Sequence, residues 1–180
     1  EFRRVLFRSK AFQLLPSVSP ELGVKTRLVI AADTAADRAE YARDALGYEQ
    51  FTLDYHDVLR HPDVDVVSIC SPNFLHMEMG IAAAKAGKAF WIEKPVGRGA
   101  HETEAVAAAA AEAGVCTSIG FNYRHPPAVE HAKVMIERGD LGRITNVRGT
   151  FFADYSSEPK GALSWRFKRE FAGSGVLGDL

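Results

Sequence analysis

Residues 64–95 read VDVVSICSPNFLHMEMGIAAAKAGKAFWIEKP, and this stretch decides the fold. It opens with an apolar, β-branched run, Val64 to Cys70, which has no polar face and therefore predicts a strand buried on both sides. A helical segment, Phe74 to Ala86, ends at Gly87, and Ala89 to Ile92 then predicts a second strand. A strand, a helix and a strand in this order predict a βαβ unit with a parallel sheet.

The same alternation continues on both sides of this stretch. Upstream, we expect the end of a helix at Ser9 to Val18 and a strand at Lys25 to Ala32. A helix at Ala35 to Leu46, which closes at Gly47, and a short helix at Asp54 to Arg60 should follow. Downstream, we expect a helix at His101 to Ala113, a strand at Val115 to Gly120 and a further helix at Pro127 to Arg138. Residues 10–142 are therefore predicted to form one α/β domain around a parallel sheet.

The pattern changes after Gly142. Arg143 to Tyr155 is rich in strand-forming residues without a helix behind it, and Ser156 to Gly161 is a polar loop. We expect a second domain to begin at residue 143 and to be cut short at residue 180. At the other end, residues 1–9 (EFRRVLFRS) lack the cleavage site of a targeting peptide and resemble translated adaptor sequence, so we expect a non-native scar there.

Composition limits the classes of partner. Of the 180 residues, 47% are hydrophobic and 25% are charged, as is usual for a globular protein. A formal net charge of -1 gives no field that would attract nucleic acid or an anionic membrane, and no apolar run reaches the roughly 20 residues that span a bilayer. We expect a cytoplasmic protein with a small-molecule partner and neither nucleic acid nor membrane. Cys70 and Cys116 lie in strand-like runs and are predicted to be buried thiols, with no disulfide and no metal site.

Asp33 follows the first predicted strand, where dinucleotide-binding folds place the acid that binds the adenosine ribose. No G-x-G-x-x-G turn precedes it, because the only glycine between Lys10 and Asp33 is Gly23. Either the fold is not a dinucleotide fold, or residues upstream of Lys10 have been lost. A carboxylate here would repel the 2′-phosphate of NADP and favour NAD, although a simple cap of the next helix explains Asp33 equally well.

The turns after two successive predicted strands hold a group of candidate site residues. These are Ser71, Pro72, Asn73 and His76 after the first strand, and Glu93, Lys94 and Pro95 after the second. Parallel sheets bind ligands outside the carboxyl ends of their strands, and a partly desolvated lysine there can exchange a proton with a substrate hydroxyl. The alternatives are local: Ser71 and Asn73 cap the next helix, His76 is a buried structural histidine, and Lys94 is a surface lysine beside a turn.

Short motifs follow one another in a fixed order along the chain. They are Ser71-Pro72-Asn73-x-x-His76, Ala86-Gly87-Lys88, Glu93-Lys94-Pro95, Gly120-Phe121-Asn122-Tyr123-Arg124, Gly139-Asp140-Leu141-Gly142-Arg143-Ile144 and Ser164-Trp165-Arg166. Together they resemble the glucose-fructose oxidoreductase, inositol dehydrogenase and MocA (Gfo/Idh/MocA) family, and the resemblance covers nearly everything from Lys10 onward. Each motif is short, but their joint order is specific and favours loss of the upstream loop over an unrelated fold.

The resemblance implies an incomplete Rossmann-type sheet followed by the start of an α+β substrate domain, with Lys94 as the catalytic lysine. It implies a cofactor site made by Asp33, Ser71, Pro72, Asn73, His76, Glu93, Lys94, Pro95, Asn122, Arg124 and Arg166. Gly173 to Leu180 resembles the family element G-x-G-x-L-x-D-x-x-x-H, which makes Asp179 a second catalytic candidate and leaves the histidine outside the sequence. We expect Asn73, Lys94 and Asn122 to share one rim, and Pro95 to follow a cis peptide bond.

The function that the resemblance implies is NAD-dependent oxidation, with NADP as the alternative cofactor, of a secondary hydroxyl group in a cyclic sugar or polyol. Within the family, the loop after Asp154 and the run Leu163 to Phe167 are most similar to inositol and levoglucosan dehydrogenases. The parent protein is expected to be a homo-oligomer, and the 180-residue chain is expected to fold poorly and not to bind NAD. Two rivals remain: a catalytically silent dinucleotide-binding sensor, and a reductase of the same fold acting on biliverdin or a dihydrodiol.

Overall fold

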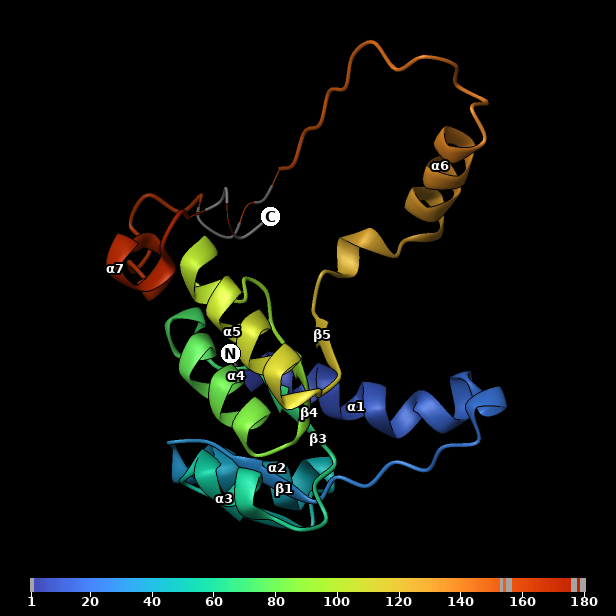
Figure 1. Cartoon of the computed structure of the whole chain (residues 1–180). Helices are drawn as coiled ribbons and strands as arrows, with labels where there is room; N and C mark the ends of the chain where they lie inside the picture. The colour runs from blue at the N-terminus through green and yellow to red at the C-terminus, as the bar shows by residue number, and fades with distance from the viewer. Residues whose placement is uncertain (1, 153, 155–156, 176–177, 179–180) are drawn as a thin grey trace.

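The computed structural model describes residues 2–152, 154, 157–175 and 178 (Figure 1). Within these residues, all strands are parallel and they form two sheets. One sheet pairs β1 (Ile30–Ala32) with β2 (Gln50–Thr52), and the other has the order β3 (Val66–Ile69), β4 (Ala89–Ile92), β5 (Thr117–Ile119). The prediction of an α/β fold with a parallel sheet is confirmed.

Helices alternate with these strands, as the sequence pattern predicts. The α-helices are α1 (Phe2–Val18), α2 (Ala36–Leu46), α3 (Tyr55–Arg60), α4 (His76–Lys85), α5 (Ala100–Ala113), α6 (Pro127–Glu137) and α7 (Arg169–Ala172). The 3-10 helices are η1 (Pro20–Leu22), η2 (Asn73–Leu75), η3 (Asn122–Arg124) and η4 (Trp165–Phe167). Gly47 and Gly114 adopt the left-handed conformation after α2 and α5, with φ of 83° and 65°, which ends these helices where the sequence predicts.

The main core lies between the three-stranded sheet and the helices α4 and α5, which pack side by side (Figure 1). Phe90 and Ile92 of β4 point toward these helices and are 2% and 1% exposed. Ala83 of α4 and Ala110 of α5 are buried against them, and such small side chains let two helices and a sheet approach closely. This packing fixes the direction of β4, and with it the position of the turn that follows.

The two sheets are not hydrogen-bonded to each other within the described residues. A small cluster of Val29, Val58 and Val64 lies between them, and Val66, although it belongs to β3, is 51% exposed. Unpaired strand edges are normally covered or continued by another strand. Helix α1 provides a second contact between the sheets, besides this valine cluster.

The first half of α1 contacts both sheets. Val5 and Leu6 pack against a cluster that includes Ala31 of β1, and the fully buried Ser9 hydrogen-bonds the hydroxyl of Tyr48. Residues 2–9 belong to the stretch that resembles translated adaptor sequence; in this structure they form helix and contact the sheet.

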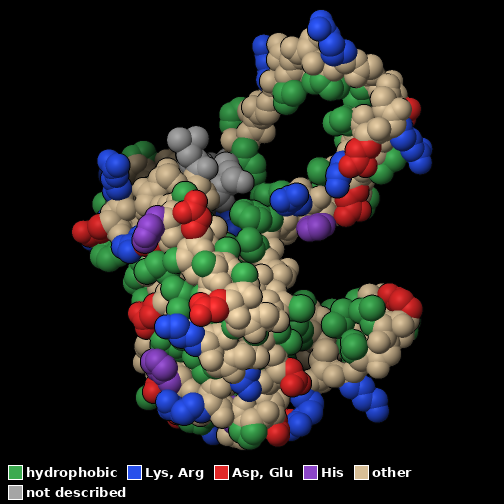
Figure 2. Space-filling model, in the orientation of Figure 1, with side chains coloured by type: hydrophobic (Ala, Val, Ile, Leu, Met, Phe, Trp, Pro, Cys, Tyr) green, Lys and Arg blue, Asp and Glu red, His purple; other side chains and the backbone are tan. Residues whose placement is uncertain are grey.

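Three expectations about local structure are wrong. No strand forms in 143–152 or at 154, and the backbone of this stretch pairs with no other described strand. Its apolar side chains are exposed instead, including Val147 at 84% and Phe152 at 91%. In Figure 1 the stretch after α6 runs as an open loop away from the sheets, and Figure 2 shows hydrophobic side chains along this loop. Cys116 is exposed rather than buried, since the neighbouring strand β5 has exposed residues throughout, while Cys70 is half-buried. The strand predicted from Lys25 begins only at Ile30.

None of the helices in the described residues is both long enough and apolar enough to cross a membrane.

Candidate functional site

The register of the three-stranded sheet brings the turns after its strands to one edge. Ile69 of β3 pairs with Ile92 of β4, which pairs with Ile119 of β5. Because parallel strands in register end together, the turns that carry Asn73, Lys94 and Asn122 all leave the same edge of the sheet. This is the edge at which open parallel sheets bind ligands.

The Ser-Pro-Asn turn holds two buried polar atoms that have no hydrogen-bond partner among the described residues. They are Oγ of Ser71 and Oδ1 of Asn73, whose residue is only 3% exposed. The other end of the Asn73 amide is held, because Nδ2 donates to the carbonyl oxygen of Ala172 at 3.3 Å. An unsatisfied buried polar atom costs about 1–3 kcal/mol, so the turn is poised to hydrogen-bond a ligand.

His76 lies beneath this turn and is completely buried. Its Nδ1 atom is 2.7 Å from the carbonyl oxygen of Pro95, and its Nε2 atom is 2.8 Å from the carbonyl oxygen of Ser71. The imidazole therefore bridges the turn after β3 and the turn after β4.

The turn after β4 begins with the buried Glu93 and continues through Lys94, which is half-buried. The Lys94–Pro95 peptide bond is cis, as predicted. Arg8 forms a 3.3 Å ion pair with Glu93 and lies over the ring of Trp91, 3.2 Å from its centroid. This end of the sheet is therefore covered by α1.

The remaining predicted residues lie on other elements than this turn. Asn122 and Arg124 are exposed on η3, and Arg166 on η4 is half-buried with its guanidinium 4.3 Å from the ring centroid of Trp165. Asp33 lies at the end of β1 in the other sheet, where its Oδ1 accepts a hydrogen bond from the backbone N–H of Ala35 at 2.9 Å. That bond forms an Asx turn before α2, whose N-cap residue is Ala35, and it leaves the second carboxylate oxygen for a ligand. Asp179 falls outside the described residues.

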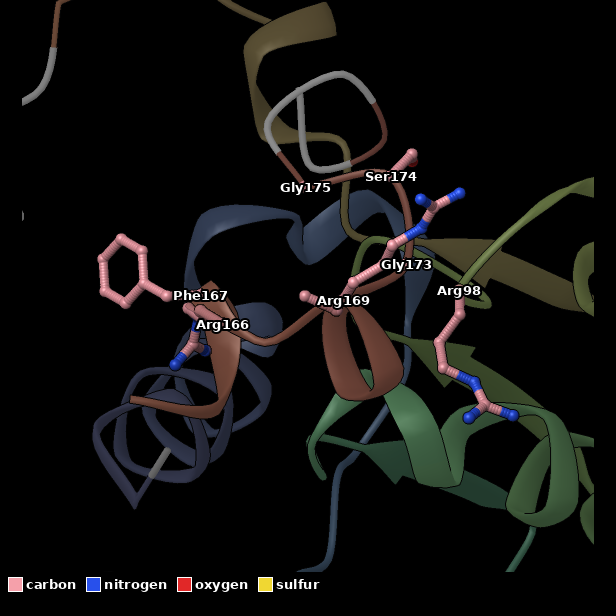
Figure 3. Close-up of a pocket in the computed structure, with 8 residues that line it drawn as sticks. Arg98, Arg166, Phe167, Arg169, Gly173, Ser174 and Gly175 are labelled. Atoms are coloured by element: carbon pink, nitrogen blue, oxygen red, sulfur yellow. The ribbon is translucent and has the colours of Figure 1, made fainter. Parts of the chain in front are cut away.

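A shallow cavity of about 740 Å³ adjoins the Asn73 turn, between the loop before α5 and the segment around α7 (Figure 3). Its lining residues are Arg98, Arg166, Phe167, Arg169, Ala172, Gly173, Ser174 and Gly175. The labelled arginine side chains point in different directions rather than toward one centre, so they do not form a common anion site (Figure 3). Arg98 was not predicted as a site residue from the sequence. Its ion pair with Glu102 has the four-residue spacing that is usual for ion pairs in helices.

A metal site has no support in the described residues, where no three His, Cys, Asp or Glu side chains are grouped to hold an ion. The Ser71 and Asn73 atoms fit the nicotinamide end of NAD instead. A hydroxyl that donates and an amide oxygen that accepts are complementary to the carboxamide of nicotinamide, which offers both an oxygen and an NH₂ group.

Two family models match the chain. Residues 11–121 match an oxidoreductase family with an NAD-binding Rossmann fold, and residues 129–180 match the GFO/IDH/MocA C-terminal domain.

Individual relatives include levoglucosan dehydrogenase from Pseudarthrobacter phenanthrenivorans, which is 44% identical over 161 residues, covering 89% of this chain and 41% of the relative. The scyllo-inositol 2-dehydrogenase (NAD(+)) of Bacillus subtilis is 35% identical over 133 residues, covering 74% of this chain and 39% of the relative. The chain thus spans less than half the length of these relatives.

Solved structures agree with this relationship. A levoglucosan dehydrogenase in complex with NADH and levoglucosan superposes with a TM-score of 0.90 at 39% identity, covering 96% of this chain and 46% of that one. An NAD binding oxidoreductase from Klebsiella pneumoniae superposes with a TM-score of 0.88 at 38% identity, with the same coverage. The chain belongs to the Gfo/Idh/MocA family of oxidoreductases, whose N-terminal domain is an NAD-binding Rossmann fold.

Proposed function

We propose that this chain is part of a longer NAD-dependent dehydrogenase that oxidises a secondary hydroxyl group of a cyclic sugar or polyol. The observation that carries the proposal is the pair of unpartnered buried atoms, Ser71 Oγ and Asn73 Oδ1, at the sheet edge from which Lys94 also emerges. The names of the relatives, levoglucosan and scyllo-inositol dehydrogenases, support a substrate of this class.

The cofactor would be held at two places. Asp33 would accept hydrogen bonds from the adenosine ribose, and its negative charge favours NAD over NADP. Ser71 and Asn73 would hold the carboxamide, with Pro72, His76, Glu93 and Pro95 shaping the same pair of turns and Asn122, Arg124 and Arg166 bordering the cleft. When bound, the nicotinamide ring supplies the hydride-accepting chemistry.

Lys94 would act on the substrate itself. Its ammonium group would donate a hydrogen bond to the reacting hydroxyl oxygen and would stabilise the partial negative charge that grows there as the carbonyl forms. Asp179 would orient both the lysine and the substrate. The family element that Gly173 to Leu180 resembles has a histidine four residues after its aspartate, and we propose such a histidine as the proton acceptor.

The finer parts of the proposal concern the whole protein. Levoglucosan and the inositols each have a ring and a secondary hydroxyl group, and we propose a substrate of this group. We further propose a homo-oligomeric, cytoplasmic parent in which residues 10–142 form the cofactor domain and residues 143–180 begin the substrate domain.

The test is an assay of protein expressed from the full reading frame that contains this sequence. NAD reduction would be followed with levoglucosan, myo-inositol, scyllo-inositol and unrelated linear alcohols. Lys94→Met is expected to lower kcat by a factor of about 10²–10⁴, the usual contribution of one proton-transferring or polarising group, while the exposed Lys85→Met serves as the matched control. No turnover of any cyclic polyol, or a fully active Lys94→Met variant, would refute the proposal.

A further inference from the structure

We propose that Arg98 is a positioning residue: together with Glu102 it holds the segment around α7 against the Asn73 turn. This contact fixes which end of the Asn73 amide faces the cofactor side. This rests on the proposed function only in its last step, the identity of the ligand that the amide oxygen meets.

The carboxylate of Glu102 holds both the backbone and the side chain of Arg98 in place. The backbone N–H of Arg98 donates to Oε2 of Glu102 at 2.7 Å, and Nε donates to Oε1 at 2.7 Å. The Glu102 side chain is only 13% exposed, so this pair is better shielded from water than an ordinary surface ion pair. The arginine is thus fixed in direction before it reaches any other group.

From this position, Arg98 contacts the end of α7. Its NH1 group donates to the carbonyl oxygen of Glu170 at 3.0 Å, where a cation also complements the partial negative charge of a helix end.

The backbone of Arg98 makes a second contact, with Gly173 (Figure 3). Gly173 has φ of 71° and ψ of -120°, and a Cβ atom built on it would overlap the carbonyl group of Arg98. Only glycine permits this approach, so two independent features, a side-chain hydrogen bond and a backbone contact, hold the two segments together.

Ala172 lies between these two contacts, and its carbonyl oxygen accepts the hydrogen bond from Nδ2 of Asn73. On the same side, Phe74 packs against Phe171 and Trp165, with ring centroids 5.1 Å and 5.8 Å apart. An asparagine amide can present either its oxygen or its nitrogen to a site. Because the nitrogen is held by Ala172, the unpartnered oxygen is presented to the ligand, where it would accept from the NH₂ group of the nicotinamide carboxamide.

The test uses protein expressed from the full reading frame that contains this sequence, with its asparagines labelled selectively with ¹⁵N in their side-chain amides. Within this sequence the asparagines are Asn73, Asn122 and Asn146, and the exposed Asn122 and Asn146 act as internal controls. The wild type is expected to show a slowly exchanging NH₂ pair that is assigned to Asn73 by its loss in Asn73→Asp. In Gly173→Ala this pair should exchange roughly tenfold faster or more, as the hydrogen bond to Ala172 is lost.

The matched control is Gly175→Ala. Gly175 also has a positive φ, of 63°, so both variants place alanine at a positive φ, but a Cβ atom at Gly175 meets nothing within 4 Å. Arg98→Gln, which removes the hydrogen bond to Glu170 without adding bulk, should accelerate the Asn73 exchange in the same direction and keeps the test valid if Gly173→Ala disrupts the fold.

The proposal is overturned if the wild type shows no protected pair, if Asn73 is unaffected in both variants, or if Gly175→Ala has the same effect as Gly173→Ala. None of these readouts involves cofactor or substrate. A dehydrogenase assay that fails while the Asn73 amide responds as expected would therefore refute the proposed function and leave the positioning role of Arg98 intact.

Discussion

Nδ1 of His76 lies 2.7 Å from the carbonyl oxygen of Pro95, which ties the first residue of α4 to the turn that carries Lys94. With Nε2 held against Ser71, a single buried ring joins the two turns that the candidate site needs. Both ring nitrogens lie against backbone carbonyls, so the geometry of the site depends on a side chain that is itself 0% exposed.

His76→Phe is therefore expected to destabilise the protein by about 2–4 kcal/mol, because the phenyl ring fills the space but has no N–H group to donate to either of the two carbonyl oxygens. Urea unfolding followed by circular dichroism measures the change. His101→Phe on the exposed surface of α5 is the control and should stay within about 0.5 kcal/mol of wild type. Equal effects of the two substitutions would contradict a structural bridge at His76.

Much of the fold was predictable because its signals are local. Ala89 to Ile92 is a strand with the predicted bounds, and Gly47 and Gly114 end helices where a left-handed residue is needed. The strand β2 was not predicted, since three residues are too few for a recognisable period, and it forms because β1 offers it a partner. Residues 143–152 show the converse: strand-forming residues stay irregular where their backbone pairs with no other described strand.

The candidate site was predictable only in part. The shared edge of Asn73 and Lys94 follows from parallel strands in register, which a sequence pattern can indicate. The Arg98–Glu102 pair is visible as a spacing of four residues, but its contact with α7 joins residues 72 positions apart. No local pattern predicts such a contact, because it arises from packing of segments distant in sequence.

Gly120→Ala is expected to destabilise the protein by about 1–3 kcal/mol, the usual cost of overpacking. A Cβ atom at this position would lie 2.5 Å from the ring of Trp91 and 3.2 Å from Oε2 of Glu93, so the ring that carries Arg8 would have to move. Thermal unfolding gives the loss of stability, and near-ultraviolet circular dichroism reports the tryptophan. Gly149→Ala, where nothing lies within 4 Å, should leave both signals unchanged.

Acid should weaken the contact between α5 and α7. Burial alone would raise the pKa of Glu102, but the hydrogen bonds from the side chain and backbone of Arg98 outweigh it, and the pKa lies below its usual value of 4.5. A carboxyl whose pKa is lowered by folding stabilises the folded state above its unfolded pKa, and this stability is lost as the pH falls through the lower, folded value. Glu102→Gln should thus be less stable than wild type at neutral pH, and the difference should shrink as the pH falls below the ordinary glutamate pKa of 4.5 and through the lower, folded value.

Thermal unfolding of wild type and Glu102→Gln across this pH range tests the prediction. Glu104→Gln, an exposed neighbour on the same helix, is the control and should follow the wild-type curve. A difference between wild type and Glu102→Gln that does not depend on pH would show that the carboxylate charge does not contribute.

The 180-residue chain alone is expected to show no measurable NAD binding by calorimetry. Asp33 lies at the end of one sheet and Asn73 at the end of the other, and the described residues contain no hydrogen bonds that join the two sheets and fix the distance between these ends. Dinucleotide affinity depends on holding the ribose and nicotinamide sites at a set spacing, with a glycine-rich turn between them for the pyrophosphate. Protein from the full reading frame is the comparison and should bind NAD saturably. Tight binding by the 180-residue chain would mean that the first half of α1, through contacts such as Arg8 with Glu93, aligns the two sheets well enough by itself.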